Sequence, residues 1–152
     1  MVLLFWIIIG ALAGSYGPVD RTEAMRWRSN GIKRVLFLVT DKSTVEKYKE
    51  YKLFGFKYRV EEYDPKLPLS VEKLKEISAW IHKNIGNFMP TVIVCEEDPT
   101  IASTFLAAYL IYRGIALVSI LMLFMKKSKY VVMPTQEQIS LLSLFEVEMR
   151  RD

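Results

Sequence analysis

The chain has 152 residues, of which 51% are hydrophobic and 25% charged, which is the composition of one globular domain with its own core. Its net charge of +4 comes from scattered Lys and Arg, which argues against a nucleic-acid-binding protein. The single cysteine excludes an internal disulfide and indicates a reducing, cytoplasmic compartment. Scarce Gln and Asn beside abundant Lys, Glu, Tyr and Ile hint at a thermophilic source.

Two apolar segments resemble membrane spans. The first, residues 1–14, is shorter than the ~20 residues of a spanning helix and lacks a basic flank, so we predict a strand at residues 3–9 within the fold. The second, residues 101–125, is long enough, but Arg113-Gly114 in its middle predicts the end of one helix and the start of another. We therefore expect no membrane span.

The remaining chain alternates between helices and strands. Periodicity and capping residues predict strands at 33–40, 56–60 and 92–94, and helices at 23–29, 44–53, 70–84, 100–112, 116–127 and 135–149. Strands separated by helices indicate an α/β fold with a central, mostly parallel sheet flanked by helices on both faces. No linker or repeat interrupts the chain, so residues 1–152 are expected to form a single domain.

Four stretches then carry a resemblance to a known family. They are IIGALAGS at 8–15, NGIKRVL at 30–36, Cys95 followed by AAYL-x-YRG at 107–114, and the closing segment with Pro134, Gln138, Leu142 and Phe145-Glu146. In this order they resemble the small dual-specificity phosphatases, a branch of the cysteine-dependent protein-tyrosine phosphatases. The resemblance covers nearly the whole chain and implies a protein-tyrosine phosphatase-like fold without a cofactor.

The resemblance implies a signature loop of His-Cys, five residues, Arg, then Ser or Thr. In the family the loop N–H groups cradle a phosphate, the Arg grips its oxygens, and the Cys attacks phosphorus as a thiolate. Here Cys95 remains as a vestigial nucleophile, but the His, Arg and Ser/Thr places hold Val94, Ile101 and Ala102. The five loop positions are Glu96, Glu97, Asp98, Pro99 and Thr100.

This loop has lost a cation and gained anions. At an effective dielectric near 20, two unit charges about 4 Å apart interact by ~4 kcal/mol, so the acids repel phosphate and raise the pKa of Cys95. We therefore predict an inactive pseudophosphatase that acts by binding or scaffolding. The alternative is an active cysteine-dependent phosphatase that hydrolyses phosphoproteins or small phosphate esters. Cys95 would be its nucleophile, and Arg21, Arg26 or Arg59 would replace the missing Arg.

The loop residues also have plain structural interpretations. Asp98 as N-cap and Pro99 as first residue suit a helix start, which would collapse the phosphate cradle. Cys95 suits a small buried hydrophobe at a strand end. A cation site built from Glu96, Glu97 and Asp98 is a weaker alternative, since adjacent residues rarely converge on one metal, and we expect no metal.

Two further features remain. The resemblance places Asp64 where the family keeps its general acid, although Asp64-Pro65 also suits a turn. The helix at 116–125 is apolar all round, which predicts a contact surface for a protein partner or a weak homodimer. Alternatively the closing helix covers it with Leu141, Leu142, Leu144 and Phe145. His82 is expected on an outer helix face without a role.

Overall fold

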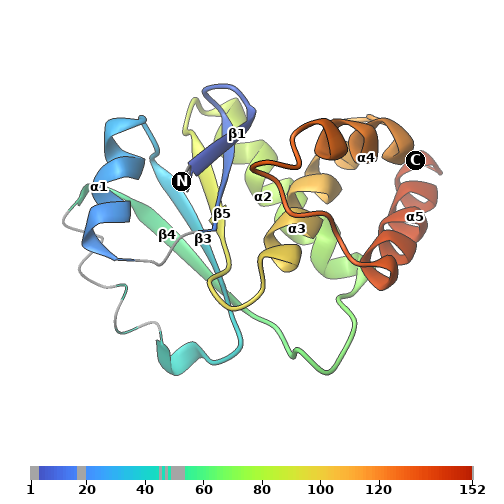
Figure 1. Cartoon of the computed structure of the whole chain (residues 1–152), viewed down its shortest axis with the longest axis horizontal. Coiled ribbons are helices and arrows are strands. Elements are labelled where there is room, and N and C mark those ends of the chain that lie inside the picture. The colour runs from blue at the N-terminus through green and yellow to red at the C-terminus, as the bar shows by residue number, and fades with distance from the viewer. Residues whose placement is uncertain (1–3, 17–19, 45, 47, 49–53, 152) are drawn as a thin grey trace.

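The computed structural model describes residues 4–16, 20–44, 46, 48 and 54–151 (Figure 1). Its sheet has the order β1-β2-β5-β3-β4. Only β1 and β2 pair antiparallel, and the other neighbours are parallel, so the predicted α/β fold is confirmed. The strands are β1 (Leu4–Ile8), β2 (Leu12–Ser15), β3 (Arg34–Val39), β4 (Lys57–Glu62) and β5 (Thr91–Val94).

Helices cover both faces of this sheet (Figure 1). One face packs on α1 and the other on a group of four helices, and each face has its own apolar cluster. Along β5 the side chains alternate between the two faces: Val92 and Val94 join the α1 cluster, while Ile93 and Cys95 join the other. The helices are α1 (Arg21–Ser29), α2 (Val71–Gly86), α3 (Pro99–Tyr112), α4 (Leu117–Lys126) and α5 (Gln136–Arg150).

The central helix is α3, which lies among the sheet, α2 and α5. Its residues from Ile101 to Ile111 are all buried, which explains why its sequence has no polar face. It ends at Tyr112, and Gly114 shortly after it has φ +94°, as the Arg113-Gly114 pattern predicts. No helix among the described residues is long and apolar enough to cross a membrane.

The hairpin at the start of the sheet differs from the sequence prediction, which has one strand there. The chain turns at Gly10 (φ +77°), with the Ala11 N–H donating to the Ile8 carbonyl at 2.9 Å, and continues as β2. Gly14 is required in β2 because a Cβ there would lie 2.3 Å from the Phe5 ring. The predicted helix at 44–53 falls largely outside the described residues.

Candidate functional site

Cys95 directly follows β5 and is 1% exposed. Its Sγ lies 3.3 Å from the hydroxyl of Tyr63, the residue that directly follows β4. Burial raises the pKa of the Cys95 thiol, although hydrogen bonds from Tyr63 and from the Glu97 and Asp98 backbone lower it in part. Burial also raises the pKa of Tyr63. The pair is therefore neutral at physiological pH, and the thiolate that a nucleophile needs is disfavoured.

The N-terminus of α3 is occupied by the chain's own carboxylate. Asp98 is the N-cap, and its Oδ1 accepts hydrogen bonds from the Thr100 N–H at 3.0 Å and the Thr100 hydroxyl at 2.6 Å. The Ile101 N–H donates to the Asp98 carbonyl at 3.1 Å, and Pro99 has no N–H. The capping interpretation of Asp98-Pro99 is thus confirmed, and the donors of the first turn of α3 are satisfied within the loop.

The remaining acids of the loop point to separate partners. Glu97 is exposed, and its carboxylate accepts from the Thr40 N–H at 3.2 Å and the Thr40 hydroxyl at 2.7 Å, which ties the loop to the end of β3. Glu96 is half-buried. In the part of the chain that the structure describes, no three His, Cys, Asp or Glu side chains are grouped as metal ligands, so the cation-site alternative at Glu96, Glu97 and Asp98 gains no support.

The position that the resemblance gives to the signature Arg is part of the core. Ile101 is 7% exposed and Ala102 is fully buried. The hydroxyls that follow are engaged elsewhere: Ser103 Oγ lies 2.5 Å from the Tyr16 hydroxyl, and Thr104 donates to the Thr100 carbonyl at 2.8 Å. None of these four side chains supplies a cation to the loop.

A cavity of about 200 Å³ lies beside the loop, above the start of α3. The segment 63–69 and the start of α5 form its other walls. Three of its lining residues are acids, Asp64, Asp98 and Glu137, and none is a Lys, Arg or His. Cys95 does not line it, but Tyr63 does, and the Tyr63 hydroxyl lies 3.3 Å from the Cys95 sulfur. The complete lining is Tyr63, Asp64, Pro65, Leu67, Pro68, Leu69, Asp98, Ile101, Thr135, Glu137, Gln138 and Leu141.

Both interpretations of Asp64 have a counterpart here. Its Oδ1 accepts from the Lys66 N–H at 2.9 Å, and its carbonyl accepts from the Leu67 N–H at 3.1 Å, so the predicted Asp-Pro turn is present. The residue is also exposed and lines the cavity. The structure thus brings Asp64, Asp98 and Ile101 together around one space, with Cys95 behind it.

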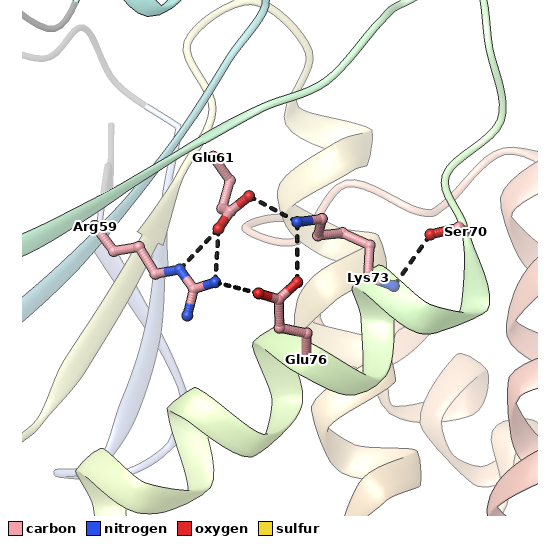
Figure 2. A network of polar contacts seen from close by, with 5 residues as sticks. All are labelled: Arg59, Glu61, Ser70, Lys73 and Glu76. Atoms are coloured by element: carbon pink, nitrogen blue, oxygen red, sulfur yellow. Dashed lines mark hydrogen bonds and ion pairs between the residues drawn. The ribbon is translucent and has the colours of Figure 1, made fainter.

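The three arginines considered as replacements for the signature Arg lie elsewhere in the fold. Figure 2 shows Arg59 of β4 in a network with Glu61 and Glu76, at 2.7 Å and 2.9 Å, which Lys73 completes at 3.0 Å from each acid. Arg59 also lies over the Trp80 ring. Arg26 pairs with the buried Glu23 at 3.0 Å, and Arg21 is an exposed residue at the start of α1. None of the three lines the cavity.

Sequence reasoning gave no role to Tyr63 or to the start of α5. Gln138 donates from Nε2 to the Thr100 hydroxyl at 2.9 Å, and it completes a capping box with Thr135. The contact between Gln138 and Thr100 joins residues far apart in the chain, which no local pattern predicts. The capping box is visible in the sequence as Thr135 followed three residues later by Gln138. His82 is exposed as expected, but its Nδ1 lies 3.1 Å from the Tyr109 hydroxyl.

No protein-family model matches the chain, and no curated protein matches it. Among solved structures, Tk-PTP in its active form is 27% identical with a TM-score of 0.79, over 95% of this chain and 97% of that chain. PTPMT1, solved in a complex with PI(5)P, is 15% identical with a TM-score of 0.78, over 93% and 94%. The human tyrosine phosphatase-like serine/threonine/tyrosine-interacting protein is 11% identical with a TM-score of 0.73, over 91% and 92%.

The latter two likenesses concern the fold alone, and the first extends to the sequence over nearly the whole chain. The resemblance to the cysteine-dependent phosphatases is thereby confirmed: the chain has a protein-tyrosine phosphatase-like fold and is similar to these proteins over nearly its whole length.

Proposed function

We propose that this protein is a pseudophosphatase, which binds another protein and does not hydrolyse phosphate esters. The observation that carries the proposal is the occupied N-terminus of α3. A helix N-terminus binds phosphate through free N–H groups, but here the Asp98 side chain and carbonyl accept from the Thr100 and Ile101 N–H groups. A phosphate at this place would have to displace a carboxylate that is covalently part of the loop.

Three further features oppose catalysis. Ile101 cannot neutralise a transferring phosphoryl group, and losing even one preorganised electrostatic contact typically costs about 2.7–4 kcal/mol of transition-state stabilisation. The cavity adds Asp64 and Glu137 as further anions near a substrate phosphate. Cys95 is buried with a raised pKa, so little thiolate is present to attack.

Hydrolysis of an aryl phosphate and of a phosphotyrosine peptide tests this proposal. We expect no turnover above that of Cys95→Ser, because neither protein has a functional cradle. Circular dichroism should show that both are folded. Turnover by the wild type that disappears in Cys95→Ser would establish the second candidate function, an active phosphatase.

Two observations favour that second candidate. The backbone hydrogen bonds of Glu97 and Asp98 to the Cys95 sulfur still lower its pKa in part, and the 27% identical Tk-PTP is described as having an active form. Under this candidate Cys95 would attack a phosphoprotein or small phosphate ester, and Asp64 would protonate the leaving oxygen. The aryl phosphate assay decides between the two.

The proposed contact surface is the outward face of α4. Leu117, Ile120 and Phe124 face the core, whereas Val118, Met122 and Met125 are 66%, 57% and 64% exposed. Positions i, i+4 and i+7 lie on one side of a helix, so the three form a continuous apolar stripe. The closing helix does not use Leu144 to cover this stripe, because Leu144 is itself exposed.

A second copy of the chain would bury this stripe as a weak homodimer; another protein is the other partner we propose. Burying on the order of several hundred Å² at ~25 cal/mol per Å² gives roughly 10 kcal/mol, which the cost of association, about 4–15 kcal/mol, nearly offsets. The proposal includes a reducing, cytoplasmic setting, which a lone buried thiol suits. It also includes a thermophilic source, which the four-residue ion-pair network of Figure 2 suits.

A further inference from the structure

An apolar groove of about 380 Å³ lies at the C-terminal end of α3. Since α3 has 14 residues, this end lies about 20 Å along the helix from the Asp98 cap, so the groove is separate from the cavity beside Cys95. The β1–β2 hairpin and α4, which form two of its walls, lie at the same upper side of Figure 1. Its walls include Ile7 and Ile8 of β1, Leu110 near the end of α3, and Ile115 and Ser119 before and on α4.

One charged residue, Arg113, stands among the described residues that line the groove. Its guanidinium donates to the Tyr109 hydroxyl at 3.2 Å and lies 5.9 Å from the Tyr109 ring centroid. These contacts orient the cation without neutralising it. Within the described part of the chain no carboxylate forms an ion pair with Arg113.

We propose that this groove binds the acyl chain of a free long-chain carboxylate, with its head group on Arg113. A mostly aliphatic cleft with a few placed polar groups, here Arg113 and Ser119, is the usual construction of a small-molecule site, and the volume falls within the usual range of about 300–1,000 Å³. The unpaired cation selects the charge of the occupant: it attracts a carboxylate and repels an ammonium. Guanidinium also matches a carboxylate geometrically, with two parallel hydrogen bonds.

The groove and the proposed partner surface use different sides of α4. Ser119 lines the groove, whereas Val118 and Met122 belong to the outward stripe. Ligand binding at the groove is therefore a property beyond the proposed function, and variants can address each surface separately.

The first experiment is calorimetric titration of the full chain with dodecanoate, dodecyltrimethylammonium and acetate, each below its micelle concentration. We expect dodecanoate to bind with one site per chain, the ammonium to bind at least about threefold more weakly, and acetate not to bind. Arg113→Gln should weaken dodecanoate binding about threefold to tenfold, in line with a partly exposed ion pair. Lys126→Gln removes the same charge from an exposed position that does not line the groove and should leave the affinity unchanged.

Two further pairs of variants guard against misfolding. Ser119→Trp should fill the groove and abolish binding, while Val118→Trp places the same ring on the outward stripe and should not. Ile115 is 43% exposed at the groove, so it tolerates charge: Ile115→Glu should weaken dodecanoate binding and Ile115→Lys should not. Circular dichroism confirms the fold of each variant.

Several results would overturn the proposal. Equal binding of dodecanoate and the ammonium would show that Arg113 does not select the ligand. Dodecanoate affinity unchanged in both Arg113→Gln and Ser119→Trp would place its binding elsewhere. If dodecanoate does not bind and the protein associates only with anionic phospholipid vesicles, the groove is a membrane contact. If dodecanoate does not bind and the protein forms a dimer that Ser119→Trp dissociates, the groove is a subunit contact.

Discussion

Replacing Asp98 with alanine tests how much the side-chain cap at the N-terminus of α3 contributes to stability. The Asp98 Oδ1 atom accepts two hydrogen bonds, at 3.0 Å and 2.6 Å, both from Thr100. Loss of a helix N-cap costs about 0.5–2 kcal/mol. Asp98 is half-buried, and its Oδ1 accepts two hydrogen bonds. We therefore expect the free energy of unfolding of Asp98→Ala to fall by about 1–2 kcal/mol, in the upper part of this range.

Asparagine separates capping from charge at the same position. Asp98→Asn keeps an oxygen acceptor for the Thr100 N–H and loses only the favourable interaction of a carboxylate with the helix dipole, about 0.3–1 kcal/mol. The expected order of stability is therefore wild type, then Asp98→Asn, then Asp98→Ala. Glu148→Ala serves as a control, because this acid is exposed and lies far from the N-terminus of its helix.

Urea unfolding followed by circular dichroism and tryptophan fluorescence measures these differences. A change in the midpoint at constant m reports stability, whereas a change in m reports altered compactness. If Asp98→Ala unfolds with the wild type, or if Asp98→Asn is as unstable as Asp98→Ala, the side-chain cap is not what holds the start of α3.

Three further predictions concern other parts of the molecule. Burial raises the pKa of Cys95 and the Asp98 charge raises it further. Iodoacetamide should therefore alkylate Cys95 more slowly than free cysteine, and faster in Asp98→Asn than in the wild type. The free energy of unfolding should fall as the pH rises above the ordinary thiol pKa, because the thiol of the unfolded chain ionises first. An apparent pKa of Cys95 below that of free cysteine would contradict both expectations. Met122→Glu should give a folded monomer in sedimentation, and a wild type that is monomeric at all concentrations refutes the α4 contact. Lys73 lowers the pKa of Glu76, so the Glu76 ion pairs stabilise the fold above the ordinary glutamate pKa and are lost as the pH falls through the lowered value. Glu76→Gln should thus melt below the wild type at pH 7 but not in strong acid, and an equal difference at both would exclude the ion pairs as the cause.

The elements with long periodic patterns could be predicted from the sequence. The buried strand at 92–94 and the helices at 100–112, 116–127 and 135–149 all agree with the structure to within a few residues, because apolar spacing and capping residues act locally. β2 could not be found in this way. Its four residues, LAGS, show no alternation, since both faces of the strand are buried and Gly14 is set by the approach of Phe5.

The candidate site likewise has features that could be predicted from the sequence and features that could not. The cap at Asp98 and the apolar Ile101, where the resemblance leads one to expect an Arg, are both visible in a few consecutive residues. The contact of Tyr63 with Cys95 joins residues 32 positions apart, and the position of Glu137 in the cavity depends on how α5 packs. Such contacts depend on tertiary packing, which no local pattern encodes.

The residues of the loop after Cys95 are physically consistent with one another, and this supports the proposal that the protein is a pseudophosphatase. The N–H groups at the start of α3 can bind either a phosphate or acceptors within the loop, and here two of them donate to Asp98. Ile101 lies in the first turn of α3, is 7% exposed and belongs to the apolar cluster on this face of the sheet. An arginine there would bury a guanidinium among aliphatic side chains, at a cost of several kcal/mol unless an anion paired with it. Under the proposed pseudophosphatase function, a catalytic variant would therefore need changes to the cap, the side chain at 101 and the acids around the cavity together.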